Sequence, residues 1–154
     1  MEALREPNPQ EKGKKFEMFF ESVMAREKEF EIIYKHSRSK QGEVDYIYRH
    51  NITYDPFWKL SHYICIECKN WKEKITSVEM DHFVSLLKAK SILTCMGIFI
   101  TTSSYEKSAL ESIKSAKNEH LLIIPLERRH LKGLIEEGFK EIVRKEGEKI
   151  VFRM

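Results

Sequence analysis

The sequence predicts an α/β domain whose mixed β-sheet has about five strands and carries helices on both faces. Residues 29–36, 43–50 and 63–71 are rich in apolar and β-favouring residues and are joined by turns or a loop, which favours antiparallel pairing. Two later apolar segments, residues 96–101 and 121–126, each follow a helical pattern. Strands connected through helices pair in parallel, so the sheet is expected to be mixed.

Composition indicates one domain of ordinary size. The chain has 154 residues, of which 42% are apolar and 33% charged, with a net charge of +3. Residues 1–10 contain two prolines and are expected to form a flexible lead-in to a single domain over residues 11–154. No apolar run is long enough to cross a bilayer, and the first residues lack the apolar centre of a signal peptide. The mildly basic balance permits a nucleic-acid partner without requiring one.

Three cysteines argue against a disulfide scaffold, because the count is odd for a chain of this size. A reducing, cytoplasmic location is therefore expected. Cys65 and Cys68 have C-x-x-C spacing, but on a strand positions three apart face opposite sides, and no second pair exists. We therefore interpret these cysteines as small buried hydrophobes.

A helix is expected over residues 11–28, because apolar side chains recur there at helical spacing. The side chains that gather on one side are Phe16, Phe19, Phe20, Val23 and Met24. At about 100° per residue, Glu17 lies roughly 90° from the centre of this stripe and Glu21 roughly 130°. Glu17 is therefore expected at the edge of the buried face and Glu21 nearer to solvent, although either can be an ordinary solvated helix acid.

Residues 29–36 and 43–50 are expected to pair as strands around a polar turn at residues 37–42. Asp45 stands out in the second of these strands, because aspartate is depleted in β-structure. Residues 51–60 contain an Asp-Pro pair and break the alternating pattern, which predicts a loop.

The segment YICIECKNW, residues 63–71, predicts the central strand. Side chains alternate along a strand, so Glu67 and Lys69 share a face and Cys68 points to the other. Charges near a core are costly unless they are paired, bound to a metal or used. For an isolated Glu-x-Lys, the simpler explanation is an incidental ion pair where the strand runs into solvent.

The second half of the chain alternates helices and strands. The expected helices run from a cap at Thr76 or Ser77 to about Lys90, from Ser103 or Ser104 to about Lys117, and from Glu127 to about Lys145 with an interruption near Gly133 or Gly138. The expected strands are residues 96–101 and 121–126, followed by an edge strand at residues 149–153.

Three carboxylates converge in this arrangement. Asp45 and Glu67 lie on consecutive strands, and the first helix packs nearby and brings Glu17 towards them. Such a cluster, even with Lys69 beside it, would be strongly repulsive without a counter-ion. Mg²⁺ prefers a few carboxylate oxygens together with water and substrate phosphate, so a hard divalent cation is expected here.

Several short motifs occur in a specific order. They are Phe16-Glu17, Gly42-Glu43-Val44-Asp45, Ile66-Glu67-Cys68-Lys69-Asn70, and Gly97 to Thr101 followed by Tyr105 to Ala109. Together, over about residues 13–134, they resemble the PD-(D/E)xK nuclease superfamily and within it the Mrr-like restriction endonuclease catalytic domain. The resemblance implies a restriction-endonuclease-like fold.

The chain departs from this family in three respects. Val44 replaces the proline of the superfamily's name, residues 51–60 look like an insertion, and no glutamine follows Gln41. Members of the family often have a glutamine after the lysine motif, and this chain has no counterpart of that residue. The insertion is rich in aromatic residues, which either contact substrate or a partner or, as the simpler interpretation, fold onto their own domain.

The resemblance implies metal-dependent hydrolysis of DNA. Asp45, Glu67 and the backbone carbonyl of Cys68 would hold Mg²⁺, or Mn²⁺ as a substitute, against the scissile phosphate. Lys69 would orient or help to deprotonate the attacking water and offset developing charge. Glu17, or Glu21 in its place, would help to hold the metal or its water shell.

Basic residues spread along the chain could contact DNA phosphates, although a solvated helix surface explains any one of them equally well. They are Lys12, Lys14, Lys15, Lys72, Lys74, Arg128, Arg129, His130 and Lys132. No segment resembles a separate sequence-reading domain, so the chain is expected to cut DNA structures, to act weakly, or to rely on a homodimer or a partner protein for target recognition. Two alternatives remain: a nuclease resembling Holliday-junction resolvases, and a non-catalytic nucleic-acid-binding module of the same fold.

Overall fold

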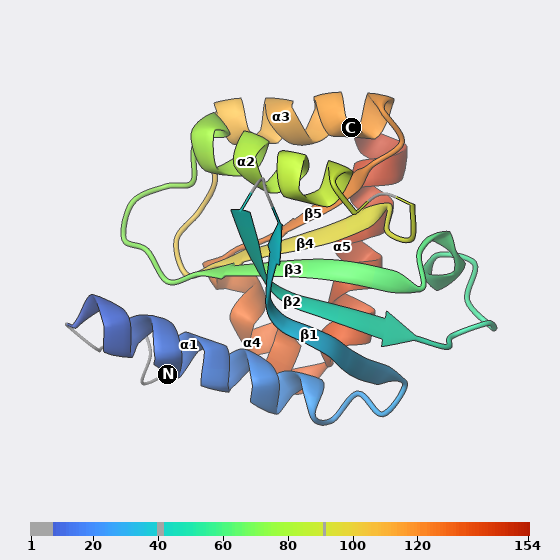
Figure 1. Ribbon diagram of the computed structural model, residues 1–154, viewed down its shortest axis with the longest axis horizontal. Coiled ribbons are helices and arrows are strands. Elements are labelled where there is room, and N and C mark those ends of the chain that lie inside the picture. The colour runs from blue at the N-terminus through green and yellow to red at the C-terminus, as the bar shows by residue number, and fades with distance from the viewer. Residues whose placement is uncertain (1–7, 40–41, 91) are drawn as a thin grey trace.

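The sheet has five strands in the order β1-β2-β3-β4-β5, with helices on both faces (Figure 1). The computed structural model describes residues 8–39, 42–90 and 92–154, without the side chains of residues 37–39. The strands are β1 (Phe30–Ser39), β2 (Gly42–His50), β3 (Tyr63–Lys69), β4 (Met96–Thr101) and β5 (Leu122–Leu126). The first three strands pair antiparallel and the last three parallel. The predicted mixed α/β sheet is therefore confirmed.

Helices form a layer on each side of this sheet (Figure 1). One layer contains α1 (Pro9–Met24), α4 (Leu131–Glu136) and α5 (Phe139–Arg153), and the other contains α2 (Ser77–Lys88) and α3 (Lys107–Asn118). The Phe20 ring of α1 lies 5.2 Å from that of Tyr46 on β2, and the Phe83 ring of α2 lies 5.4 Å from that of Phe99 on β4. A Cβ at Gly97 would lie 2.9 Å from the Phe83 ring, so the absence of a side chain lets α2 approach β4 closely.

Helix α1 begins earlier and ends earlier than residues 11–28. Asn8 caps it, since its side-chain oxygen accepts hydrogen bonds from the N–H groups of Gln10 and Glu11 at 3.0 and 3.2 Å. Pro9 occupies the first helical position, where its fixed φ favours helix and no N–H is needed. Of the lead-in expected over residues 1–10, residues 1–7 lie outside the described part of the chain, and Pro9 and Gln10 belong to α1.

The β1–β2 hairpin is longer than expected. Pairing continues to Ser39 opposite Gly42, so a polar turn over all of residues 37–42 is wrong. Backbone groups make the ladder whatever the polarity of the side chains, and a polar tip facing solvent therefore stays in strand conformation. Residues 40–41 lie outside the described residues.

The loop over residues 51–60 folds onto its own domain. It ends in the short helix η2 (Trp58–Leu60), and Trp58 is fully buried. The Trp58 ring lies 5.1 Å from the rings of Phe30 and His50, while Phe57 is also buried. The simpler interpretation of this aromatic loop is therefore confirmed for these two side chains.

The C-terminal segment corrects one prediction. Residues 149–153 belong to α5 and do not form an edge strand. The buried positions of this helix recur at intervals of three to four residues: Phe139, Ile142, Val143, Gly147 and Ile150. That period continues through the segment and outweighs the β-propensity of its three consecutive apolar residues. The interruption predicted in the last helical segment is at Gly138, whose φ of 96° requires a left-handed backbone. The short helix η3 (Arg128–His130) precedes α4.

None of the helices among the described residues combines the length and apolarity needed to span a membrane. The three cysteines are free thiols. Burial raises the pKa of the Cys65 thiol to about 11, so this side chain stays protonated in the core.

Candidate active site

The site lies where β2 and β3 separate. Their pairing ends at Tyr46 opposite Ile66, and beyond this point the Asp45 carboxylate enters the gap between the strands. Its Oδ2 atom accepts a hydrogen bond of 2.8 Å from the backbone N–H of Cys68. The side chain thus occupies the position that a backbone carbonyl would take in a continuous ladder.

Glu67 lies beside Asp45 and is buried, with 5% of its surface exposed. Strand β3 fixes its position, because the residues before it are held in the core between β2 and β4. Burial raises the pKa of Glu67 well above its usual range, a hydrogen bond and repulsion from Asp45 add to the rise, and Lys69 opposes it. Without a cation, the charged form of Glu67 is therefore disfavoured beside Asp45.

The carbonyl group of Cys68 faces the same gap. In a β-strand the N–H and C=O of one residue point to the same side, and the Cys68 N–H points to Asp45. The next carbonyl, that of Lys69, points the other way and accepts the Thr102 N–H at 3.1 Å. The backbone oxygen predicted as a metal ligand is therefore directed towards Asp45.

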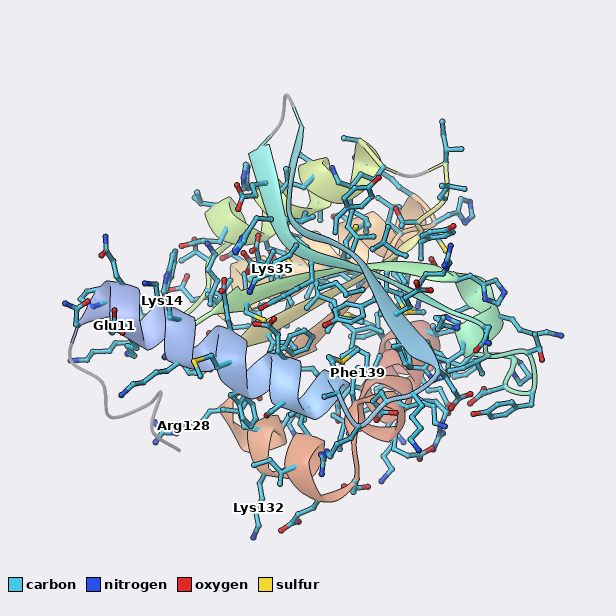
Figure 2. All side chains as sticks on the ribbon, turned by 60° about the horizontal axis from the view of Figure 1, so that its bottom comes forward. Glu11, Lys14, Lys35, Arg128, Lys132 and Phe139 are labelled. Carbon is cyan, nitrogen blue, oxygen red and sulfur yellow. The ribbon has the colours of Figure 1, made fainter. Side chains whose placement is uncertain are left out.

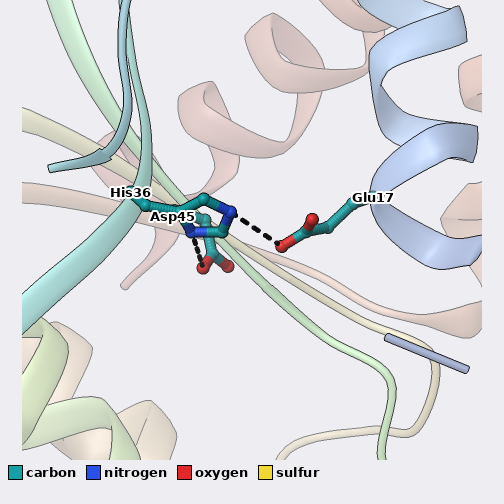
Figure 3. A group of neighbouring side chains, drawn as sticks. All are labelled: Glu17, His36 and Asp45. Carbon is teal, nitrogen blue, oxygen red and sulfur yellow. Dashed lines mark ion pairs between the residues drawn. The ribbon is translucent and has the colours of Figure 1, made fainter. Parts of the chain in front are cut away.

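Glu17 reaches this site from α1 and meets His36 there (Figure 3). His36 Nε2 lies 3.7 Å from Glu17 Oε1, and His36 Nδ1 lies 3.9 Å from Asp45 Oδ1. One potential ligand atom from each of the three residues lies within 4.8 Å of the other two. Burial first, and then Asp45, raises the pKa of Glu17, which His36 partly opposes.

Sequence reasoning missed His36. The pairs Lys35–Tyr46 and Ser37–Val44 flank it, so the register of the hairpin places it across from Asp45. Its φ of 57° is unusual for a residue with a side chain and interrupts the ladder at this point. Its Nδ1 also lies 2.9 Å from Glu43 Oε1. Pairing that continues to Ser39 and Gly42 would have revealed this position, whereas a predicted polar turn over residues 37–42 concealed it.

Glu21 does not join this cluster. Its carboxylate pairs with Lys35 at 3.2 Å and accepts a hydrogen bond of 3.2 Å from the Tyr46 hydroxyl. The Glu21 side chain is 36% exposed and that of Glu17 is 23% exposed, in the predicted order. Of the two helix acids, Glu17 is therefore the one placed beside Asp45, and Glu21 is engaged elsewhere.

Lys69 projects from the end of β3 towards an aromatic ring. Its ammonium nitrogen lies 5.3 Å from the centre of the Trp71 ring. In the part of the chain that the structure describes, it makes no ion pair with a carboxylate, and Glu67 influences it only through longer-range attraction. The incidental ion pair between Glu67 and Lys69 is therefore not present, and the ammonium is available to a substrate.

A basic cleft of about 730 Å³ opens near this lysine. Its lining contains five of the predicted phosphate contacts, Lys12, Lys72, Lys74, Arg128 and Arg129, together with Trp71, Thr102, Ser103, Ser104 and Glu127. The name basic cleft refers to this set of ten residues.

The other predicted phosphate contacts lie outside the basic cleft. Lys14 is exposed on α1, 3.9 Å from Glu11 (Figure 2), and Lys15 is half-buried on the same helix. Lys132 is exposed and pairs with Glu136. His130 is buried, and its Nδ1 accepts the Glu127 N–H at 2.9 Å, so it is not available to a phosphate.

We call the point where β2 and β3 separate the fork. The donor groups there suit a hard divalent cation. Asp45, Glu67 and Glu17 supply carboxylate oxygens, the Cys68 carbonyl faces the same gap, and burial together with repulsion from Asp45 raises the pKa of both Glu67 and Glu17. A cation would offset this repulsion and favour the charged carboxylates. Oxygen donors of this kind fit Mg²⁺, and the His36 imidazole adds one nitrogen.

Comparison with known proteins identifies the family. Residues 10–135 match the family model of the restriction endonuclease with an Mrr catalytic domain. No curated protein matches the sequence.

Solved structures with a similar fold include a repair endonuclease from Pyrococcus abyssi (21% identity, TM-score 0.44, covering 73% of this chain and 45% of that one). A second is EndoMS in a complex with dsDNA (13% identity, TM-score 0.46, covering 73% and 44%), and a third is SfsA from Pyrococcus furiosus with Ca²⁺ (16% identity, TM-score 0.40, covering 73% and 54%). The chain spans about half the length of these proteins. Since the family match extends over most of its sequence, the chain belongs to the Mrr-type restriction endonuclease family, a family of nucleases.

Proposed function

We propose that this chain is a Mg²⁺-dependent endonuclease that hydrolyses phosphodiester bonds in DNA. The observation that carries the proposal is the convergence of Asp45, Glu67 and Glu17 at the fork between β2 and β3. Lys69 stands beside them with an ammonium group that no carboxylate within the described residues neutralises. Membership of the restriction endonuclease family supports this chemistry.

Asp45, Glu67 and the Cys68 carbonyl would hold the metal ion, with Glu17 acting directly or through its water shell. His36 would complete the donor set, because it lies within reach of both Glu17 and Asp45. Bound Mg²⁺, or Mn²⁺ in its place, would lower the pKa of a coordinated water and stabilise charge on the scissile phosphate.

Lys69 would act on the reacting groups themselves. Its ammonium would orient the attacking water and offset the negative charge that develops on the phosphate oxygens. Water adds to phosphorus and the bond to the 3′ oxygen breaks, so the products carry 5′-phosphate and 3′-hydroxyl ends. Burial of Glu67 excludes bulk water from one side of the site and strengthens these interactions.

The basic residues would hold the DNA. Lys72, Lys74, Arg128 and Arg129 line the basic cleft near Lys69, where phosphates flanking the scissile bond would lie. Lys14 and Lys15 would extend this contact along α1. A second copy of the chain or a partner protein would supply target recognition, and we place this reaction in a reducing cytoplasm, where free thiols persist.

Single-turnover cleavage tests the proposal on supercoiled, linear, methylated and four-way-junction DNA in Mg²⁺, Mn²⁺ or EDTA. We expect cleavage with either metal and none in EDTA, and a loss of at least about 10² in rate for Asp45→Asn. Lys88→Ala, which removes an exposed lysine paired with Glu119 on the opposite helix layer, is the matched control and should cleave normally.

Binding of DNA with no cleavage in either metal would overturn the proposal and assign the chain to a non-catalytic module. Symmetrical cutting of four-way junctions alone would keep the endonuclease chemistry and assign the chain to a junction resolvase.

Metal binding by calorimetry gives a second readout that does not depend on cleavage. Mg²⁺ or Mn²⁺ should bind at millimolar to sub-millimolar concentration. His36→Gln should weaken Mn²⁺ more than Mg²⁺, because an imidazole nitrogen suits Mn²⁺ better than it suits Mg²⁺. Equal effects on both ions would remove His36 from the donor set.

A further inference from the structure

The basic cleft lies at the carboxyl ends of the three parallel strands. The loops that follow β3, β4 and β5 supply nine of its ten lining residues, and Lys12 of α1 supplies the tenth. In α/β sheets, ligands bind in the crevice outside the carboxyl ends of parallel strands. The position of this cleft in the fold is therefore that of a binding site, next to the site at the fork.

Hydrogen bonds between the loops hold the floor of the basic cleft in place. The Thr102 hydroxyl donates to Asn70 Oδ1 at 2.7 Å, and the Ser103 hydroxyl donates to the Glu73 carbonyl at 2.7 Å. The Arg128 N–H donates to the Ser103 carbonyl at 3.2 Å. The loops after β3, β4 and β5 are thus linked to one another, which gives a preorganised surface.

The charge of the basic cleft is strongly positive. Arg129 pairs with Glu127 at 2.6 Å, so these two charges offset each other. The four remaining cations, Lys12, Lys72, Lys74 and Arg128, make no ion pair with any residue of the described part of the chain. Four cations concentrated in one hollow attract a polyanion more strongly than the same charges spread over a helix.

Trp71 adds an aromatic wall to this positive cleft. It is half-buried, packs partly against the core, lines the basic cleft, and has its ring centre 5.3 Å from the Lys69 ammonium. Its backbone carbonyl accepts the Thr102 hydroxyl at 3.3 Å, which ties the residue to the neighbouring loop. The same aromatic residue therefore lines the cleft and contacts Lys69.

A duplex would make little use of such a ring. Its phosphates face outward while the faces of its bases are stacked inside, so basic side chains can contact it but Trp71 cannot reach a base face. Proteins that bind unpaired strands combine a positive groove for the backbone with aromatic rings on which bases stack. The basic cleft has both features.

We propose that the basic cleft binds an unpaired stretch of nucleic-acid strand next to the scissile phosphate, with one base stacked on Trp71. Lys72, Lys74 and Arg128 hold its phosphates. The substrate class is thus DNA with a single-stranded segment, such as a flap, a gap or a frayed end. As a site of cleavage this rests on the proposed nuclease function, whereas the preference in binding stands on the basic cleft alone.

The test is fluorescence anisotropy in EDTA, with labelled twelve-residue oligothymidylate and a labelled blunt duplex. Trp71→Ala should weaken oligothymidylate binding by about 5- to 150-fold, the effect of losing one stacked base, and change duplex binding less than about twofold. Trp71→Phe keeps a ring and should retain most of the affinity. Lys74→Ala, which removes one phosphate contact, should reduce the slope of log affinity against log salt by about 0.7 on the single strand.

Equal effects of Trp71→Ala on single-stranded and duplex DNA, or no effect on either, would overturn the inference. Melting curves show whether each variant is folded, and if Trp71→Ala is not, the comparison of wild type with Trp71→Phe and Lys74→Ala decides. The two proposals fail separately. If Trp71→Ala weakens single-strand binding selectively but no DNA is cleaved in Mg²⁺, the nuclease function is refuted and the inference stands. If DNA is cleaved but Trp71→Ala does not distinguish single strands from duplex, the inference is refuted and the nuclease function stands.

Discussion

Replacement of Lys69 by alanine separates catalysis from binding and stability. The substitution removes the ammonium at the end of β3 and leaves the Asp45 and Glu67 carboxylates in place. The variant should fold, bind metal and DNA, and lose most of its cleavage. The loss follows from removal of a group that acts on the attacking water and on the developing phosphate charge.

The magnitudes follow from what Lys69 contacts. Loss of one well-placed electrostatic or acid–base group lowers a rate by about 10² to 10³. For stability, the only contact of the ammonium within the described residues is the Trp71 ring at 5.3 Å, worth about 0.5–1 kcal/mol at a partly exposed site. For a domain of this size that corresponds to a fall of about 1–4 °C in Tm.

The assay is single-turnover cleavage at saturating Mg²⁺, with a melting curve of each variant. Lys88→Ala serves as the control, because it removes a lysine of the opposite helix layer that pairs with Glu119. Full cleavage by Lys69→Ala together with a lowered Tm would show that Lys69 is only structural. That result would refute its catalytic role.

Three further predictions concern charge and protonation. In EDTA, Asp45→Asn should raise Tm by a few degrees, because it relieves repulsion with Glu67 while the amide oxygen can still accept the backbone N–H; added Mg²⁺ should then no longer stabilise the variant. Glu17→Gln should lower the cleavage rate more than Glu21→Gln, because the Glu21 carboxylate pairs with Lys35; the reverse order of rates would exchange the roles of the two acids. Burial lowers the pKa of both His50 and His130, so unfolding takes up protons below the unfolded pKa of about 6.5. Their contribution to the free energy of unfolding is present above that pH and should be lost as pH falls, at up to about 1.4 kcal/mol per pH unit for each histidine.

The last of these predictions is measured by urea unfolding between about pH 7.5 and 5. His130→Gln is the matched variant, since a neutral amide cannot take up the proton. It should show a weaker loss of stability at acid pH than the wild type. Identical pH profiles would show that His130 is not a neutral, buried imidazole.

The local sequence pattern alone determined the central strand, the placement of several site residues and the mixed sheet. The alternation from Tyr63 to Lys69 predicts both the central strand and the common face of Glu67 and Lys69, because side chains on a strand alternate by geometry alone. The same reasoning places Glu17 at the edge of the α1 stripe, and the side-chain exposures follow that order. The order of strands and helices was sufficient to predict a mixed sheet, because the length of a connection limits whether the strands it joins pair antiparallel or parallel.

Where local patterns compete, the tertiary structure decided. Residues 149–153 contain β-favouring residues, yet the helical period of α5 extends through them, because burying Ile150 against the domain outweighs a short local preference. The hairpin continues to Ser39 and Gly42 because its backbone pairs irrespective of side-chain polarity.

The composition of the sites also depends on the tertiary structure. His36 meets Glu17 and Asp45 only through the register and the bend of the hairpin, neither of which a single strand's sequence contains. Trp71, Ser103 and Arg128 come together only because parallel strands bring their carboxyl ends to one edge of the sheet. Spacing along the chain reports which side chains share a strand or helix, whereas proximity across elements is set by pairing and packing.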